Sequence, residues 1–451
     1  MTASTSELLK TARVSASRGD DGAARSAYLE FLGSEPTHFA ALNELGALAL
    51  SGGYRSAART AYEQAVRHHP DNPVGRVNLA NLLLEDGEPA SAREHLEAAL
   101  AVQPRFAPAH QGMARALAAL GENERAAPHW RKGFEANAVV SQPCRGSGSP
   151  IPVLQLVSAH GGNVATNRFL DDRVFAVTSL YSEYFDPDEK LPSHGVVFNA
   201  IGDADLCARG LMAAAGIAAS TRAQIINPPD RVLQTGRVET ARRLSHVPNI
   251  VVPRMLPLSR AKIGEAASLG FPLLLRAPGF HTGRHFVRVE REEEIVPAAS
   301  SLPGDTLLAI EYLDARGTDG CTRKYRVMFI DGELYPLHLA VSDDWKIHYF
   351  TAQMATHAAH RGEERHFLDD MHGVLGRQAV TALREIAGTL ALDYAGIDFA
   401  LDAERRLLVF EANATMVINA PDGDPLWDYR RPAIARALSA AQKLVRDRAQ
   451  R

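Results

Sequence analysis

The sequence has few cysteines and no long apolar run. Its 451 residues include only three cysteines, Cys144, Cys207 and Cys321, and these are far apart in the chain. They form neither a CxxC pair nor an even-numbered framework, so a disulfide-stapled fold is excluded and a reducing cytoplasm is expected. No apolar run approaches membrane-spanning length. The first residues, MTASTSELLKTARVSASRGD, lack the apolar core of a signal peptide, which agrees with a cytoplasmic protein.

A strong excess of charge of one sign is also missing. The chain has 49 basic and 53 acidic residues, a formal net charge of −4. This balance gives no reason to expect a nucleic acid or a membrane as partner. Apolar residues make up 46% and charged residues 23% of the chain, as in an ordinary globular protein, and the length exceeds that of one typical domain.

The first 138 residues repeat with a period of 34. The two strongest copies match at Leu45 and Leu79, Ala58 and Ala92, Tyr62 and Leu96, Ala65 and Ala99, and Pro70 and Pro104. Weaker copies lie 34 residues before and after them. This period, with small residues where helices cross and a closing Pro, resembles the tetratricopeptide repeat. The resemblance implies an all-α solenoid of stacked helix pairs over residues 1–139.

Such a solenoid commonly binds an extended peptide on its concave side. We expect a peptide or protein partner there, and the inner helices offer Arg13, Asn43, Asn81, Gln111 and Arg115 as groove residues. The alternative for any one of these residues is a solvated helix position.

A change of pattern follows the repeats. Residues 140–150, VSQPCRGSGSP, have the composition of a linker. Strands then alternate with helices over 151–235, which predicts a small α/β domain with a largely parallel sheet. Asp203 is expected to begin a helix that stops at Gly216. SAHGGN, at 158–163, is interpreted as a turn after a strand, with an oxyanion loop as the less favoured alternative.

A pair of acids marks the C-terminal part of the chain. GIDFALDAERRLLVFEAN predicts two strands joined by a turn at residues 402–404. Glu411 and Asn413 lie two positions apart and therefore share a face of their strand. Pairing across the hairpin brings Asp398 opposite Glu411, and two carboxylates with one amide oxygen suit Mg²⁺. The alternative is a solvated hairpin end whose acids are incidental.

The segments before this hairpin have a recognisable order. FPLLLRAPGFHTGRHFVRVE predicts two strands around a glycine loop, and the later strands form a hairpin through Asp331-Gly332. A long helical stretch with a break at Gly373 follows. This order resembles the ATP-grasp superfamily, and most closely its glutathione synthetase, D-Ala–D-Ala ligase and RimK group. The resemblance covers about 151–447.

The resemblance implies a three-part α/β (α+β) ATP-grasp fold: a preliminary α/β domain at 151–235, a central lid at 236–310 and a C-terminal subdomain at 311–451. It implies ATP and two Mg²⁺ ions as cofactors, with Asp398, Glu411 and Asn413 as the metal ligands. It implies an adenine-binding hinge at Glu311, Tyr312 and Leu313, with Asp314 or Asp319 reaching the ribose.

The same resemblance implies cationic phosphate ligands. Arg276 and Arg237 occupy positions where the superfamily usually has lysines, and they keep the charge but change the geometry from a point to a planar fork. Arg326 would contact the reacting phosphate or acyl oxygens, and Lys324, on the same strand face, would assist. Arg326 and Arg276 are therefore the candidate catalytic residues.

Two functions of different kind follow. The first is an ATP-dependent carboxylate–amine ligase acting through an acylphosphate, with a peptide or protein substrate recruited by the repeats and a small-molecule or peptide amine as acceptor. The second is a scaffold whose ligase-like domain binds nucleotide without catalysis, which the Arg-for-Lys exchanges suggest. Phosphoryl transfer to a hydroxyl is a further variant. His357–His366 is interpreted as a charged lid or acceptor-binding segment, with a metal site as the alternative.

Overall fold

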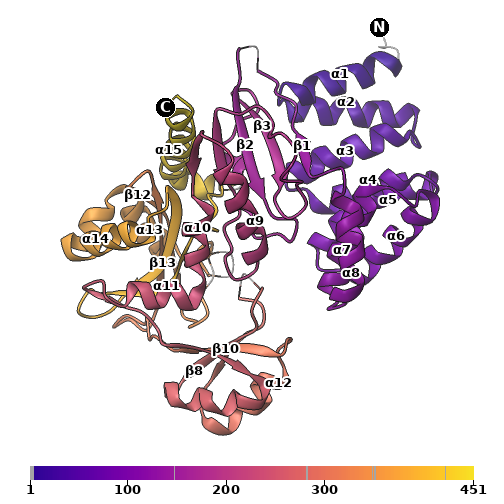
Figure 1. Cartoon of the computed structure of the whole chain (residues 1–451). Helices are drawn as coiled ribbons and strands as arrows, with labels where there is room; N and C mark the ends of the chain where they lie inside the picture. The colour runs from indigo at the N-terminus through magenta and orange to yellow at the C-terminus, as the bar shows by residue number, and fades with distance from the viewer. Residues whose placement is uncertain are drawn as a thin grey trace. The chain divides into compact units, whose positions relative to one another are not determined.

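A computed structural model describes residues 5–146, 148–280, 283–347, 349, 352–421 and 423–450. The chain divides into two compact units, Met1–Val139 and Val140–Arg451, whose elements are labelled in Figure 1. Each unit is described by itself.

The regular structure of the described part of the first unit is helical up to Phe134, as the repeat pattern predicts, and Val139 begins strand β1 (Val139–Ser141). Its helices are α1 Thr5–Ser17, α2 Asp21–Ser34, α3 Phe39–Ser51, α4 Arg55–His68, α5 Pro73–Glu85, α6 Pro89–Val102, α7 Ala107–Ala119 and α8 Asn123–Phe134. Each packs against the next along the chain, and the alanines that recur every 34 residues, Ala24, Ala58, Ala92 and Ala126, are at most 1% exposed. Small residues therefore let successive helices approach closely.

The turns inside the helix pairs repeat as well. Gly19, Gly53, Gly87 and Gly121 have φ between 76° and 82° and lie 34 residues apart. Left-handed backbone is accessible to glycine without a steric penalty. This periodic glycine is a second signature of the repeat, in addition to the buried alanines.

The second unit begins with a five-stranded sheet in the order β1-β3-β2-β4-β5. Its strands are β1 Val139–Ser141, β2 Ile151–Val157, β3 Phe175–Tyr181, β4 Val196–Asn199 and β5 Gln224–Ile226. The pairs β2–β3, β2–β4 and β4–β5 are parallel, as predicted. The expected linker is partly strand, because β1 joins the edge of this sheet and the Gln142 amide donates to the Val177 carbonyl.

Two helix predictions in this region are wrong. Asp203 does not begin a helix: its carboxylate accepts from the Leu206 amide in a turn, and helix α9 (Ala208–Ala219) begins later. Gly216 lies inside α9, where the apolar face continues past it. After β5 the chain forms α10 Pro229–Val232, η2 Leu233–Thr235 and α11 Arg237–Leu244.

The second sheet is antiparallel, in the order β7-β10-β8-β9, and is covered by short helices with a core of its own (Figure 1). Its elements are β7 Met255–Ser259, η3 Arg260–Leu269, β8 Leu273–Arg276, β9 Phe286–Val289, η4 Glu292–Glu294, α12 Ile295–Ser300 and β10 Thr306–Glu311. It occupies most of the range predicted for the lid. Residues 237–251 differ from that prediction, because α11 packs on β14 and strand β6 pairs with β14 in the third sheet.

The third sheet has the order β12-β11-β13-β14-β6. Its elements are β6 Ile250–Val251, β11 Thr322–Ile330, β12 Glu333–Ser342, α13 Ala358–Asp369, α14 Met371–Leu390, β13 Tyr394–Leu401, β14 Leu407–Asn413, η5 Pro425–Arg430 and α15 Arg431–Ala449. The predicted hairpin through Asp331 and Gly332 is confirmed, with φ of 50° and 83° at the turn. Helix α15 packs on strands of both the first and the third sheet.

The predicted helix break at Gly373 is wrong. The chain leaves the helix at Asp370, whose side chain caps α14 by accepting from the Gly373 amide. A second irregularity falls at Gly376, where φ is 77°. Gly373 is thus the third residue of the new helix, and an acidic N-cap three positions earlier stops the first one.

Candidate functional site

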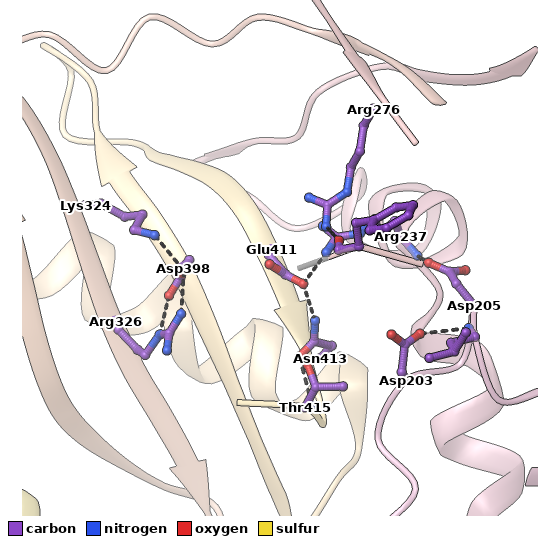
Figure 2. A network of polar contacts seen from close by, with 12 residues as sticks. Asp203, Asp205, Arg237, Arg276, Lys324, Arg326, Asp398, Glu411, Asn413 and Thr415 are labelled. Atoms are coloured by element: carbon purple, nitrogen blue, oxygen red, sulfur yellow. Dashed lines mark hydrogen bonds and ion pairs between the residues drawn. The ribbon is translucent and has the colours of Figure 1, made fainter. Parts of the chain in front are cut away.

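The hairpin of β13 and β14 brings the two predicted acids together. Asp398 pairs with Glu411 across the antiparallel ladder, and Gly396 pairs with Asn413. The register that alternation predicted is therefore confirmed. A shift of register immediately after Asp398 marks a bulge, and bulges commonly re-aim side chains beside functional sites. Figure 2 shows Asp398, Glu411 and Asn413 with the cationic side chains around them.

Asp398 is buried between two cations from the neighbouring strand β11. Its two oxygens accept from Arg326 Nε and Nη2 at 2.6 and 2.8 Å, and Lys324 Nζ lies 3.2 Å from Oδ2. The Asp398 side chain is only 5% exposed. Burial alone would raise the pKa of this carboxyl, but the charges of Arg326 and Lys324 hold the pKa well below its ordinary value. Asp398 is therefore an anion in the folded protein.

Glu411 has a different partner. Its Oε1 accepts from Arg237 Nη2 at 2.6 Å and from Asn413 Nδ2 at 2.7 Å. The amide oxygen of Asn413 in turn accepts from the backbone amide and hydroxyl of Thr415. Burial would raise the pKa of Glu411, but Arg237 outweighs it and the pKa is lowered. The positively charged partner of Glu411 thus comes from helix α11, which is not part of the sheet.

Arg276 brings a second guanidinium to this place. It ends strand β8 and donates to the Phe280 carbonyl in the glycine loop that follows, between Gly279 and Gly283. Burial and the positive charge of Arg237 lower the pKa of Arg276 to about 10, while Glu411 acts in the opposite direction. The guanidiniums of Arg237 and Arg276 therefore lie near each other beside Glu411, and the carboxylates of Asp203 and Asp205 also attract Arg276 (Figure 2).

A small cavity adjoins the two β14 ligands. It measures about 20 Å³ and is lined by Thr235, Arg237, Thr240, Ala241, Leu244, Val252, Pro253, Met255, Val409, Phe410, Glu411, Ala412 and Asn413. A water molecule needs about 10–15 Å³ of such space. The cavity thus has room for one water or one small ion beside the Glu411 carboxylate.

The residues predicted for the hinge lie at the end of β10 and just after it. Glu311 receives Arg254 Nε at 3.1 Å, and the ring of Tyr312 lies under the Arg288 guanidinium at 4.3 Å. Leu313 packs beside Ala315. The structure brings none of these three side chains into contact with Asp398 or Glu411 in any of the interactions described.

The two acids predicted for the ribose each have an arginine partner. Asp314 binds Arg316, with 2.5 Å between Oδ2 and Nη2, and Asp319 binds Arg323 at 2.7 Å. Their roles toward a nucleotide remain predictions.

Sequence reasoning missed a buried histidine. His338 is the register partner of Arg326 across β11 and β12. It is 7% exposed, and its Nδ1 has no hydrogen-bond partner among the described residues. Burial and the charge of Arg326 keep its pKa well below the ordinary value, so the ring is neutral. The sequence did contain a signal for this residue. The predicted hairpin of β11 and β12 determines which residue of β12 pairs with Arg326, and that residue is His338.

The histidine-rich segment 357–366 forms helix α13 and the residue that precedes it. The rings of His357 and His360 stack at 4.7 Å, but Glu364 points elsewhere, with Oε2 2.5 Å from the Tyr429 hydroxyl and Oε1 3.2 Å from Arg430 Nε. Within the described ranges, no three His, Cys, Asp or Glu side chains gather as metal ligands. The metal alternative that joined Glu364 to the two histidines is therefore wrong.

The predicted groove residues of the first unit take part in contacts between its helices. Arg13 pairs with Glu44 at 2.8 Å, and Asn78 donates to the Asn43 side chain at 2.9 Å. Gln111 donates to the Gly133 carbonyl, and Arg115 lies 3.3 Å from Asn81 Oδ1. The contacts of Arg13, Asn43 and Arg115 join neighbouring repeats, whereas that of Gln111 joins the two helices of the last pair.

A cavity of about 250 Å³ lies in the first unit between α4, α5 and α6. Its lining consists of Arg59, Glu63, Val66, Arg67, Leu79, Leu83, Ser91 and His95. Its lining includes the buried side chains of Leu79 and Leu83 and the exposed ones of Glu63 and Arg67.

Comparison with known proteins identifies the repeats. Residues 83–128 match the family model of the tetratricopeptide repeat, so the first unit carries repeats of this kind. The chain is 21% identical to MamA over 29% of its own length and 77% of that chain, with a TM-score of 0.28. It is 22% identical to MamA from Desulfovibrio magneticus RS-1, over 29% of this chain and 73% of that one, with a TM-score of 0.27.

A third solved structure is a tetratricopeptide repeat protein from Parabacteroides merdae. It is 24% identical and covers 30% of this chain and 53% of its own, with a TM-score of 0.28. None of the curated proteins matches the chain. Among the described residues, no helix combines the length and the apolar character needed to cross a membrane.

Proposed function

We propose that the chain is an ATP-dependent carboxylate–amine ligase whose tetratricopeptide repeats hold a peptide or protein substrate. The observation that carries the proposal is the meeting of Asp398, Glu411 and Asn413 on one hairpin with four cationic side chains around them. The order of sheets in the second unit, first parallel, then antiparallel, then mostly antiparallel around this hairpin, agrees with the resemblance to ATP-grasp enzymes.

The residues present fit a hard divalent cation. Two carboxylates and an amide supply oxygen ligands, and a cavity with room for a small ion adjoins Glu411 and Asn413. We assign Asp398, Glu411 and Asn413 to Mg²⁺. When bound, Mg²⁺ would neutralise charge on the phosphates of ATP during phosphoryl transfer.

The chain's own cations would complete the charge balance. Arg237 and Arg276 lie at the side of Glu411 and would bind phosphate oxygens, while Arg326, held in place by Asp398, would orient the reacting carboxylate. Phosphoryl transfer depends on such positioning and electrostatic stabilisation more than on a covalent residue. The absence of a nucleophile–base pair from the proposed residue set is consistent with this chemistry.

The second candidate is a nucleotide-binding scaffold without catalysis. One observation favours it: both carboxylates are already neutralised by guanidinium or ammonium groups of the chain. Under this alternative the site binds ATP, and no ADP is released with any carboxylate and amine.

The test has two stages. Isothermal calorimetry and thermal melting with Mg-ATP come first, because a ligand that binds only the folded state raises the melting temperature. Release of ADP is then assayed against peptide pools with amines. Binding with ADP release supports the ligase, binding alone supports the scaffold, and no binding at millimolar Mg-ATP rejects both. Asp402→Asn, in the turn of the same hairpin, is the matched control for Glu411→Gln, since Asp402 pairs only locally with Arg406.

A further inference from the structure

Resting on the proposed function, we propose that Arg237 is a built-in counter-ion that keeps divalent metal off Glu411 until a polyphosphate anion draws the guanidinium away. Metal binding at this hairpin is then conditional on nucleotide. Four features of the site support this role: the contacts of Glu411, the different setting of Asp398, the anchoring of the Arg237 backbone, and the presence of a second guanidinium.

Glu411 already has a cation in direct contact. Arg237 Nη2 lies 2.6 Å from Oε1, the same oxygen that accepts from Asn413 at 2.7 Å. The Asn413 side chain presents its NH₂ group toward Glu411, while its oxygen is occupied by Thr415. A metal at Glu411 therefore requires that the guanidinium leave and that the amide of Asn413 turn over. Mg²⁺ alone would gain two protein ligands in this exchange, while the protein would lose four hydrogen bonds.

Asp398 is held in another way. Its cations, Lys324 and Arg326, come from β11, the adjacent strand of the same sheet, and Arg326 is its register partner. Its side chain is 5% exposed, against 24% for Glu411. The pairing at Asp398 is thus part of the sheet, whereas the cation at Glu411 comes from the separate helix α11. We therefore expect a metal ion to replace the resident cation at Glu411 and not at Asp398.

The backbone of Arg237 is fixed while its side chain crosses to the sheet. Its amide donates to Asp205 Oδ2 at 3.0 Å, and a Cβ on the preceding Gly236 would lie 2.5 Å from Asp205 Oδ1. The side chain can therefore move from carboxylate to phosphate without any displacement of α11.

Arg276 adds a second positive charge that can attract an anion. Its guanidinium is close enough to Arg237 for repulsion between them to help lower its pKa, and both lie beside Glu411 in Figure 2. Glu411, Asp203 and Asp205 all attract the Arg276 guanidinium, whose described hydrogen bond goes to the Phe280 carbonyl. A triphosphate offers several anionic oxygens, and guanidinium forks bind phosphate bidentately. A bound triphosphate would therefore accept hydrogen bonds from both arginines, and Glu411 would then be available to the metal.

The experiment measures metal binding directly, with Mn²⁺ as the probe. Electron paramagnetic resonance counts free Mn²⁺ in the presence of the full chain, and water-proton relaxation reports a protein–ATP–Mn²⁺ complex. Wild type should bind Mn²⁺ alone poorly, and Arg237→Gln should bind it at least about tenfold more tightly, within the range of ordinary site coupling. Arg237→Lys should lie between them. Arg242→Gln, in the same helix with its side chain 70% exposed, should match wild type.

The outcomes separate this inference from the proposed function. If wild type binds Mn²⁺ alone as tightly as Arg237→Gln, the gating role of Arg237 is overturned while the ternary complex still supports a nucleotide site. If neither binds Mn²⁺ alone, Arg237 is not what excludes the metal, and the inference is again overturned. If wild type forms no ternary complex with ATP and Mn²⁺, the proposed function itself fails. Equal melting temperatures of the variants show that folding is not the cause of any difference.

Discussion

Replacing Asp398 by Asn tests the central ion cluster most directly. The change keeps the shape of the side chain and removes one buried negative charge that Arg326 and Lys324 share. At about 3 Å and an effective dielectric constant of ~20, each pair has a gross attraction of about 5 kcal/mol. Desolvation offsets much of this attraction, and breaking a buried pair by removing one partner typically costs about 3–5 kcal/mol. We expect the free energy of unfolding of the second unit to fall by that amount.

The assay follows urea unfolding of the full chain by tryptophan fluorescence. Trp130 lies in the first unit, while Trp345 and Trp427 lie in the second. In a Trp130→Phe background the fluorescence therefore reports the second unit. Asp314→Asn is the matched control, because its pair with Arg316 is about half exposed, and exposed pairs contribute only about 0–1 kcal/mol.

The effect must also depend on pH with a definite sign. The folded pKa of Asp398 is depressed relative to an unfolded value of about 3.9. Its stabilisation is therefore fully present above about pH 4 and is lost as the pH falls toward the folded pKa. The difference between wild type and Asp398→Asn should be constant from pH 5 to 8 and should narrow below pH 4. A loss under 1 kcal/mol at pH 7, or a difference that widens in acid, refutes the reasoning.

Three further predictions concern other residues. Glu411→Gln should lower ADP release by at least about 10²-fold, the scale of a lost electrostatic contributor, with an unchanged circular dichroism spectrum; near wild-type release would mean that Glu411 is only a structural partner of Arg237. Leu96→Ala, at a fully buried position, should lower the free energy of unfolding of the first unit by about 2–5 kcal/mol, measured by urea unfolding through Trp130 fluorescence. Leu29→Ala, at an exposed position, should leave that free energy unchanged, and neither variant should alter binding of Mg-ATP. Burial lowers the pKa of His110 and His129, so the unfolded chain takes up protons first and the melting temperature of the first unit should fall as pH drops from 7 to 5; an unchanged or rising value contradicts this sign.

Local patterns made much of the fold predictable. The 34-residue period located the helix pairs because every pair must bury the same face against its neighbours. Alternation along β13 and β14 predicted the register in which Asp398 pairs with Glu411, because a strand has a side-chain period of two. The turn at Asp331 and Gly332 was readable from two residues with a preference for left-handed backbone.

Other features depend on contacts that local patterns do not contain. Arg237 binds Glu411 across 174 positions, and nothing in the sequence near Arg237 indicates that pairing. The break before α14 was misplaced because a glycine at position 373 suggested it, while Asp370 makes it by capping the next helix. The strand at residues 139–141 was hidden in a linker-like composition, and only the open edge of β3 gives it a partner.

The packing of α15 has a consequence for the order in which the protein folds during synthesis. One continuous apolar core includes Val153 and Phe198 of the first sheet, Met328 of the third, and Ile434 and Val445 of α15. The first sheet therefore lacks part of its core until α15 has been synthesised. The antiparallel sheet around β8 and β10 has a core made only from residues 256–309. It can close earlier, so the middle of the second unit completes its folding before its beginning does.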